Sequence, residues 1–287
     1  MIQLINDDCY KAIKDILDKS IDLVYIDVPY QFEQGGEGGA FGAKNRPYRK
    51  DIRLGSSDKL ERLKAKVEKY KKLMAEAKSQ EEYNKWYSYC GNEQKKIAYL
   101  GIDNGFDLGI LDELCRVMKY IYIYIWCSKE QIYPLMKYFV EDKKCRSNIL
   151  CWCKTNPTPS TNNSWLPDVE YCLVFKEANA PTYNDGYQLK SKWYVSAANK
   201  RDKDLWGHPT IKPLELVKRH IEHSTNPGDT VLDCFMGSGT TGVACKMLNR
   251  NFIGMEIDKH YFEIAEARIN EGKALKENEQ ISLFDEE

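Results

Sequence analysis

Four consecutive residues near the start of the chain combine a carboxylate, a proline and an aromatic ring. Asp27-Val28-Pro29-Tyr30 follows the apolar run Asp22 to Ile26, which has the length and composition of a buried strand. Asp27 and the main-chain carbonyl of residue 28 are two hydrogen-bond acceptors, and Pro29 restrains residue 28 to an extended conformation. Tyr30 supplies a flat ring for stacking. The segment therefore predicts a pocket for a planar ligand that carries an amino group.

A second segment, near the other end of the chain, has the features of a nucleotide-binding loop. The apolar strand Thr230 to Asp233 runs into Cys-Phe-Met-Gly-Ser-Gly-Thr-Thr, and a helix follows. The two glycines allow a tight turn and close approach of the main chain to a ligand. The next apolar run ends in Glu256, whose carboxylate suits two ribose hydroxyls. The glycine spacing does not fit the dinucleotide fingerprint.

Together, and in this order, the two segments resemble those of the β group of DNA amino-methyltransferases, which use S-adenosylmethionine. A third block, His-Pro-Thr-Ile-Lys-Pro at 208–213, is similar to the family's block that holds the methionine end of the cofactor. The resemblance covers residues 1–32 and 108 to about 268. Two residues depart from the usual pattern, because Val28 and Cys234 stand where the family usually has proline.

The resemblance implies which residues hold the cofactor and the target base. An acid after the family's first strand touches the cofactor's adenine, and Asp8 matches it, although either Asp8 or the adjacent Asp7 could cap the helix. The implied cofactor-binding residues are Asp8, His208, Thr210, Lys212, Asp233, Phe235, Gly237, Ser238, Gly239, Thr240 and Glu256. The implied catalytic residues are Asp27, Val28, Pro29 and Tyr30.

The implied reaction is methylation of an exocyclic amine on a base flipped out of double-stranded DNA. Such an amine is a poor nucleophile because the ring draws in its lone pair. Asp27 and the carbonyl of residue 28 would therefore accept hydrogen bonds from its two protons. Asp rather than Ser at position 27 favours N6 of adenine, with N4 of cytosine as the alternative. The absence of a Pro-Cys dipeptide argues against methylation of a ring carbon of cytosine.

Val28 raises a question about turnover. Its φ is not fixed as that of proline is, and its β-branched side chain enters the pocket wall. A catalytically weak or inactive DNA-binding protein on the same scaffold is therefore a rival hypothesis. Methylation of structured RNA is a second rival.

Composition limits the class of protein. The chain of 287 residues is long enough for one large α/β domain with an insertion, or for one domain and a half. Its 43% hydrophobic and 30% charged residues fit a soluble globular protein. Ten scattered cysteines predict reduced thiols in a cytoplasmic setting, and the resemblance implies a bacterial or phage source. No signal peptide is expected, and the apolar run Tyr120 to Cys127 is too short to span a bilayer. His220 and His223 lack a third ligand, so packing is expected there rather than a metal site.

Alternating strands and helices predict an α/β fold with a doubly wound, mostly parallel sheet. The resemblance implies the Rossmann-like arrangement of class I methyltransferases, with permuted motif order and a helical insertion. A helix from Cys9 to Leu17 is expected to carry Ala12, Ile13, Ile16 and Leu17 on one apolar face. The segment from Ala178 to Trp206 has no clear period.

Residues 1–32 and 101–287 are expected to form the catalytic domain, with 33–100 as the insertion and 177–207 as a short target-recognition segment. A helix from about Asp58 to about Lys78 carries a narrow apolar seam, which predicts packing on the segment Glu81 to Leu100. The loop before this helix is basic, so it is a candidate for contacts with DNA phosphates. Its candidate residues are Lys44, Arg46, Arg49, Lys50 and Arg53. Double-stranded DNA is the expected partner, and a homodimer and a cognate restriction enzyme are left open.

Overall fold

The computed structural model describes residues 1–30, 56–77, 79, 81–90, 106–157, 165–181, 186, 190–198 and 211–271. The chain forms two compact units. One unit comprises Met1–Val28 and Asp107–Glu287, and the other comprises Pro29–Phe106. Among the described residues, no helix is both long and apolar enough to cross a membrane.

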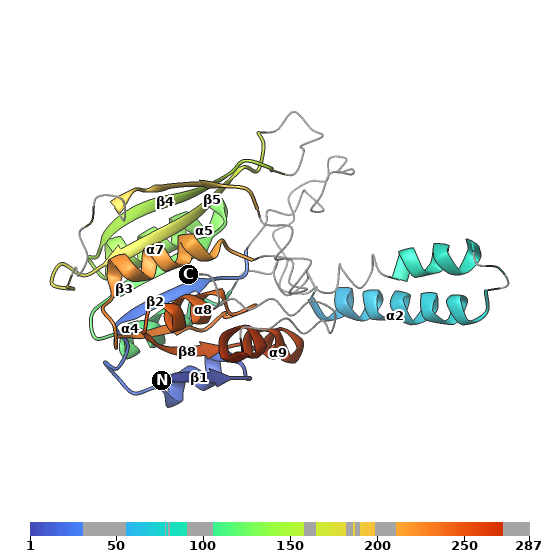
Figure 1. Ribbon diagram of the computed structural model, residues 1–287, viewed down its shortest axis with the longest axis horizontal. Coiled ribbons are helices and arrows are strands. Elements are labelled where there is room, and N and C mark those ends of the chain that lie inside the picture. Colours follow the sequence, from blue (N-terminus) through green and yellow to red (C-terminus); the bar gives the residue numbers. More distant parts are fainter. Residues whose placement is uncertain are drawn as a thin grey trace. The chain divides into compact units, whose positions relative to one another are not determined.

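The larger unit is built on one eight-stranded sheet with the order β1-β8-β7-β2-β3-β5-β4-β6 (Figure 1). The first five strands in this order run parallel, and β5 is antiparallel to both of its neighbours. The strands are β1 (Ile2–Ile5), β2 (Leu23–Asp27), β3 (Tyr122–Cys127), β4 (Arg146–Lys154), β5 (Val169–Lys176), β6 (Trp193–Ser196), β7 (Thr230–Asp233) and β8 (Asn251–Met255). The predicted doubly wound, mostly parallel sheet is confirmed.

Helices cover both faces of the parallel part of this sheet. One face carries α7 (Leu214–Ser224), α8 (Thr240–Met247) and α9 (Lys259–Glu266), and the other carries α4 (Ile110–Val117) and α5 (Lys129–Met136) (Figure 1). Every residue of β3 is buried, as in a strand covered on both faces. Leu216 and Val243 are in one core cluster with Trp126 of β3. The apolar runs of the sequence are therefore the middle strands of the sheet.

Two local predictions in the larger unit differ from the structure. The helix expected from Cys9 to Leu17 is α1 (Cys9–Ala12) followed by one 3₁₀ turn, Ile13–Asp15. Ile16 is already extended, so Leu17 is 77% exposed instead of buried. Strand β6 lies in the segment without a clear period and pairs in parallel with β4. The regular structure at both places is only a few residues long, so periodicity gave too long a helix at the first and no element at the second.

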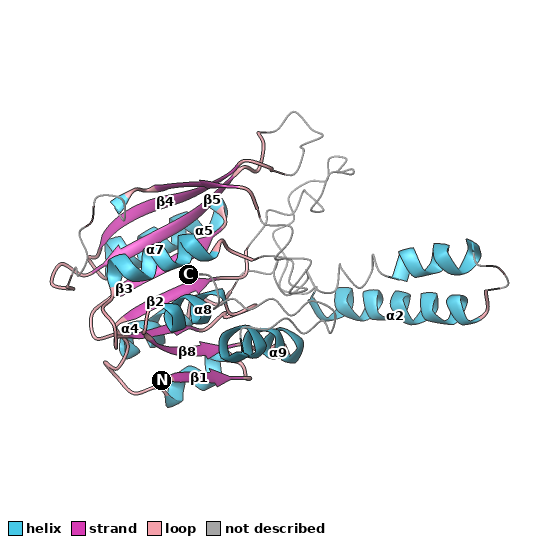
Figure 2. Cartoon of the chain, in the orientation of Figure 1, coloured by secondary structure: helices cyan, strands magenta, loops and turns pink. Residues whose placement is uncertain are grey.

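The smaller unit contains α2 (Ser56–Ala75) and a second helix at residues 81–90 (Figure 2). The ring of Tyr70 stacks on Trp86 with 6.0 Å between centroids, and it lies 5.8 Å from the ring of Tyr89. Val67 and Cys90 are buried. The predicted packing of the seam on the following segment is confirmed. The basic loop with Lys44, Arg46, Arg49, Lys50 and Arg53 lies outside the described residues.

Candidate active site

The acidic side chains singled out in the sequence lie along one edge of the sheet. Asp27 is the last residue of β2 and Asp233 the last of β7, while Glu256 directly follows β8. The pairing registers align these strand ends, since Val24 pairs with Leu232 and Asp233 pairs with Gly254. In an open α/β sheet this carboxyl edge is where ligands bind. The fold therefore brings Asp27, Asp233 and Glu256 to one edge of the sheet.

The loop after β7 is closely packed against α9 and depends on its glycines. Gly237 and Gly239 have φ of +52° and +79°, which side chains rarely tolerate. A Cβ atom on Gly239 would lie 2.9 Å from the Cβ of Ala265 and 2.9 Å from the Cδ1 of Ile269. The turn and the close approach therefore both require glycine at position 239.

Asp233 stabilises this loop by accepting two hydrogen bonds. Its Oδ2 accepts a hydrogen bond from the hydroxyl of Thr241 at 2.6 Å, and its Oδ1 accepts one from the main-chain N–H of Phe235 at 3.1 Å. Asp233 is only 3% exposed, and burial raises the pKa of its carboxyl from 3.8 to about 7. Its contacts join the start of the loop to the first turn of α8.

Arg268 also holds the loop, and sequence reasoning missed it. Its Nη1 donates to the carbonyl oxygen of Ser238 at 2.6 Å and to the hydroxyl of Thr240 at 3.3 Å. The side chain comes from the π-helical turn Ala267–Glu271 and is 3% exposed. A buried arginine that donates to two loop oxygens fixes their orientation. Nothing in the sequence near Arg268 indicated this contact.

Glu256 and Asp8 lie at the ends of neighbouring strands, because Ile5 of β1 pairs with Met255 of β8. The two carboxylate oxygens of Glu256 accept main-chain N–H groups of Gly237 and Asp258, at 2.8 and 2.9 Å. Burial raises the pKa of Glu256. Each oxygen has a second lone pair for a further donor. Asp8 is half-buried and caps α1 by accepting from the N–H of Tyr10, so Asp8 and not Asp7 caps this helix.

Asp27 is paired with a buried lysine. The Nζ of Lys212 lies 2.5 Å from the Oδ2 of Asp27, and the Lys212 side chain is 9% exposed. The same ammonium lies 5.1 Å from the centroid of the Trp126 ring. Lys212 thus contacts the catalytic-motif carboxylate. His208 and Thr210 of the same block lie outside the described residues.

Val28 continues strand β2 by one more hydrogen bond. Its main-chain N–H donates to the carbonyl oxygen of Trp126 at 3.3 Å, and its side chain is 2% exposed. A proline at this position could not make this bond, because it has no N–H. Pro29 and Tyr30 follow and are both half-buried.

Residues 21–267 match the family model described as DNA methylase, of the N6/N4 type. The chain belongs to this DNA methylase family. The Type II methyltransferase M2.LlaDCHI of Lactococcus lactis subsp. cremoris is 28% identical over 281 residues, which are 94% of this chain and 89% of the relative. The Type II methyltransferase M2.DpnII of Streptococcus pneumoniae is 29% identical over 279 residues, 93% of this chain and 88% of the relative.

Solved DNA methyltransferases have the same architecture. The M1.HpyAVI structure, in complex with its cofactor SAM, superimposes with a TM-score of 0.54 at 26% identity, covering 93% of this chain and 100% of that chain. The cytosine-N4-specific PvuII DNA methyltransferase gives a TM-score of 0.59 at 15% identity, covering 97% and 88%, and shows the shared fold. The resemblance inferred from the motifs is thus confirmed at the level of the family.

Two further charged residues of this DNA methylase are linked to Asp27 through Lys212 and were missed in the sequence. Glu170, near the start of β5, contacts the Nζ of Lys212 at 3.1 Å. Lys154, the last residue of β4, contacts the other oxygen of Glu170 at 2.5 Å. Because β5 is antiparallel to β3, its first residues lie at the edge where the parallel strands end. The one sequence feature that could have indicated Glu170 is that it is the single acid in the otherwise apolar run from Val169 to Phe175.

His220 of the DNA methylase belongs to the core beneath the site. It is 3% exposed, and its Nδ1 lies 3.2 Å from the hydroxyl of Tyr25, which accepts from the indole N–H of Trp126 at 2.9 Å. Its ring stacks on Tyr124 with 5.1 Å between centroids. Burial, together with the charge of Arg219, lowers the pKa of His220 to about 3. A neutral imidazole in an aromatic cluster is the packing role expected from the sequence.

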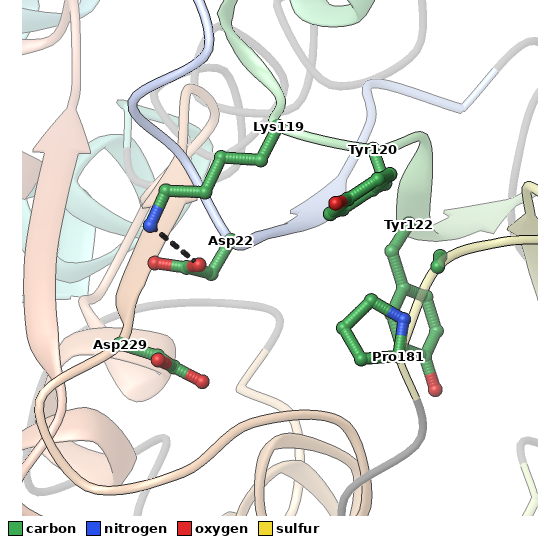
Figure 3. A pocket seen from close by; sticks show the side chains of 7 residues that line it. Asp22, Lys119, Tyr120, Tyr122, Pro181 and Asp229 are labelled. Carbon is green, nitrogen blue, oxygen red and sulfur yellow. Dashed lines mark hydrogen bonds and ion pairs between the residues drawn. The ribbon is translucent and has the colours of Figure 1, made fainter.

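A cavity of about 330 Å³ lies at the opposite edge of the sheet (Figure 3). Asp22 directly precedes β2 and Asp229 directly precedes β7, so this cavity is at the amino ends of the strands. Lys119 points across it to Asp22, with 2.7 Å between Nζ and Oδ1 (Figure 3). The Oδ2 of Asp22 accepts the N–H of Thr230 at 2.9 Å. Asp22 thus connects the amino ends of β2 and β7. These groups lie at the edge of the sheet opposite to Asp27, Asp233 and Glu256.

Proposed function

We propose that this DNA methylase transfers the methyl group of S-adenosylmethionine to N6 of an adenine flipped out of double-stranded DNA. The observation that carries the proposal is the position of Asp27 at the carboxyl end of β2, beside the glycine loop that follows β7. The carboxyl edge of the sheet therefore carries both an acceptor for an amine and a loop suited to a nucleotide. Asp at position 27 favours adenine N6, and cytosine N4 is the alternative.

The residues along the edge fit the cofactor. Gly237 and Gly239 bring main chain to the ligand side of the loop, and Glu256 has carboxylate oxygens oriented by two main-chain N–H groups. Glu256 would hold the ribose hydroxyls, and Asp8 on the neighbouring strand end would reach the adenine. Asp233 acts indirectly, since both of its oxygens hold the loop itself. The bound cofactor would supply an electrophilic methyl group and would leave as S-adenosylhomocysteine.

The catalytic segment supplies the acceptors that the reaction needs. One amine proton would be bound by the Asp27 carboxylate and the other by the carbonyl of Val28. These bonds favour a more tetrahedral nitrogen whose lone pair points at the methyl carbon. As the nitrogen–carbon bond forms, the amine becomes cationic and must lose one proton, for which Asp27 is the nearest carboxylate of this motif. Tyr30 would stack on the extruded base.

DNA contacts are proposed for two further regions. Residues 177–207, which include β6, would read the target sequence. The smaller unit would bind phosphates through the basic loop and through α2, whose described part exposes five lysines. They are Lys64, Lys66, Lys69, Lys71 and Lys72. A homodimer and a cognate restriction enzyme stay compatible with this function.

Transfer of a labelled methyl group to mixed-sequence DNA tests the proposal. The DNA is digested to nucleosides, and N6-methyladenine is the expected labelled product. N4-methylcytosine would overturn the choice of base, and label only in structured RNA would overturn the choice of nucleic acid. Asp27→Ala should abolish transfer while retaining cofactor binding, which separates loss of chemistry from loss of the fold. No label with the wild-type protein would favour the rival of a non-catalytic DNA-binding protein.

A further inference from the structure

Four charged side chains of alternating sign form a chain that ends at Asp27. Lys154 contacts Glu170 at 2.5 Å, Glu170 contacts Lys212 at 3.1 Å, and Lys212 contacts Asp27 at 2.5 Å. The four side chains are 20%, 18%, 9% and 29% exposed in this order. They come from β4, β5, the segment before α7 and β2, so only the folded sheet brings them together.

The pairing of β5 with β4 and β3 fixes the position of Glu170, so that Glu170 can in turn position Lys212. Glu170 stands opposite Trp152 in the β4–β5 ladder, and the next residue, Tyr171, pairs with Cys127 at the end of β3. Burial alone would raise the pKa of Glu170, but the charges of Lys212 and Lys154 outweigh it and lower the pKa to about 2. Glu170 is therefore an anion throughout the neutral range.

Lys212 has two anionic neighbours rather than one, and this matters for the carboxylate of Asp27. An ammonium bound to Asp27 alone would direct its full charge at that carboxylate and compete with a target amine for it. Glu170 contacts the same ammonium from another strand and shares that charge. The ring of Trp126, 5.1 Å away, bounds the position of the ammonium on a further side.

We propose that Glu170 is a positioning residue for methyl transfer, which holds Lys212 so that Asp27 is oriented while it still accepts a hydrogen bond from the target amine. This inference rests on the proposed function, because it assigns Asp27 to the amine. Lys154 pairs with the carboxylate oxygen of Glu170 that does not contact Lys212. Neither Glu170 nor Lys154 needs to touch the base or the cofactor.

The first test measures Lys212 directly and does not require turnover. Within the described residues, the titratable groups beside Lys212 are the carboxylates of Asp27 and Glu170 and the thiols of Cys127 and Cys172. Burial of Lys212 lowers its pKa, but Asp27 and Glu170 outweigh this and raise the pKa above 10.5. In Glu170→Gln, a nuclear magnetic resonance titration of labelled lysine should show the Lys212 pKa falling. An unchanged pKa would overturn the coupling.

The second test is a double-mutant cycle on the chemical step. Under single-turnover conditions with saturating DNA and cofactor, Glu170→Gln should slow methyl transfer at least about tenfold, since a misplacement of about 1 Å can cost about 10²-fold. The cofactor dissociation constant should change less than about twofold. In a Lys212→Met background, Glu170→Gln should have almost no further effect, because its partner is gone. Glu170→Asp, which keeps the charge, should recover part of the rate.

The matched control is Glu113→Gln, which removes a carboxylate that pairs with Arg116 at 2.8 Å in α4. It should leave the rate of methyl transfer unchanged. Additive losses in the cycle, or a loss of thermal stability with an intact rate, would overturn the positioning role. If the wild-type protein transferred no methyl group while the Lys212 titration shifted as expected, the coupling would stand and the proposed function would fail.

Discussion

The main-chain N–H of Val28 donates to the carbonyl oxygen of Trp126 at 3.3 Å, one residue beyond Asp27. The ladder between β2 and β3 therefore continues one residue past Asp27, at the position where the family usually has a proline. A proline fixes φ there, whereas Val28 holds the same backbone by a hydrogen bond and a buried side chain. Stiffness is thus provided by a different means, and the valine is compatible with an active site.

Val28→Pro should therefore weaken the protein rather than improve it. The substitution leaves the Trp126 carbonyl without this donor, at a cost of about 1–3 kcal/mol, and regains about 0.4–1 kcal/mol from the stiffer unfolded chain. A net loss of about 1 kcal/mol in the free energy of unfolding is expected from urea titration, with no gain in methyl-transfer rate. Val28→Ile, which retains the N–H, is the control. Activity that appears only in the proline variant would instead support the inactive-scaffold rival.

Gly239→Ala should disrupt the cofactor loop. The added methyl group meets Ala265 and Ile269 at 2.9 Å, and φ of +79° strains any side chain by about 1–3 kcal/mol. We expect cofactor affinity, measured by calorimetry, to fall at least about tenfold, which corresponds to about 1.4 kcal/mol.

Gly228→Ala separates strain from crowding in that experiment. Gly228 has φ of +90°, but nothing lies within 4 Å of a Cβ placed there. It directly precedes Asp229 at the amino edge of the sheet, away from the loop. Gly228→Ala should lower the unfolding free energy modestly and leave the cofactor dissociation constant unchanged. Equal losses of affinity in both variants would show that the contacts of Gly239 with α9 do not matter.

Asp233 should make stability depend on pH in a defined direction. Burial raises the pKa of its carboxyl to about 7, above the ordinary 3.8, so between these values the folded protein binds a proton that the unfolded chain releases. The contribution of this group is fully present below about pH 4 and is lost as the pH rises through about 7. Three pKa units correspond to roughly 4 kcal/mol at most.

Asp233→Asn isolates that contribution, because the amide retains the shape and cannot titrate. Urea unfolding at several pH values between 5 and 8 should show wild-type stability falling relative to the variant as the pH rises. The difference between the two proteins should level off above the folded pKa. Parallel curves would mean that Asp233 is already ionised across this range in the folded protein.

The sequence predicted the parts of this molecule in which neighbouring residues determine structure. Runs such as Asp22 to Ile26 predicted buried strands followed by acids, and those acids lie at one edge of the sheet. What it missed depends on distant chain segments. Glu170 reaches Lys212 only because β5 runs antiparallel to β3, and Arg268 reaches Ser238 because the turn Ala267–Glu271 packs against α8. Leu17 was misplaced because α1 ended early.

Neutralising the basic loop of the insertion should weaken DNA binding and its dependence on salt. Glutamine at Lys44, Arg46, Arg49, Lys50 and Arg53 removes up to five phosphate contacts, and each changes the slope of log K against log salt by about 0.9. Filter binding at several salt concentrations should give a slope shallower by up to about 4.5. A control variant replaces exposed lysines of the larger unit, which are Lys11, Lys14, Lys19, Lys137 and Lys144. Cofactor affinity should survive in both variants, and its collapse in the loop variant would make the region part of the catalytic core.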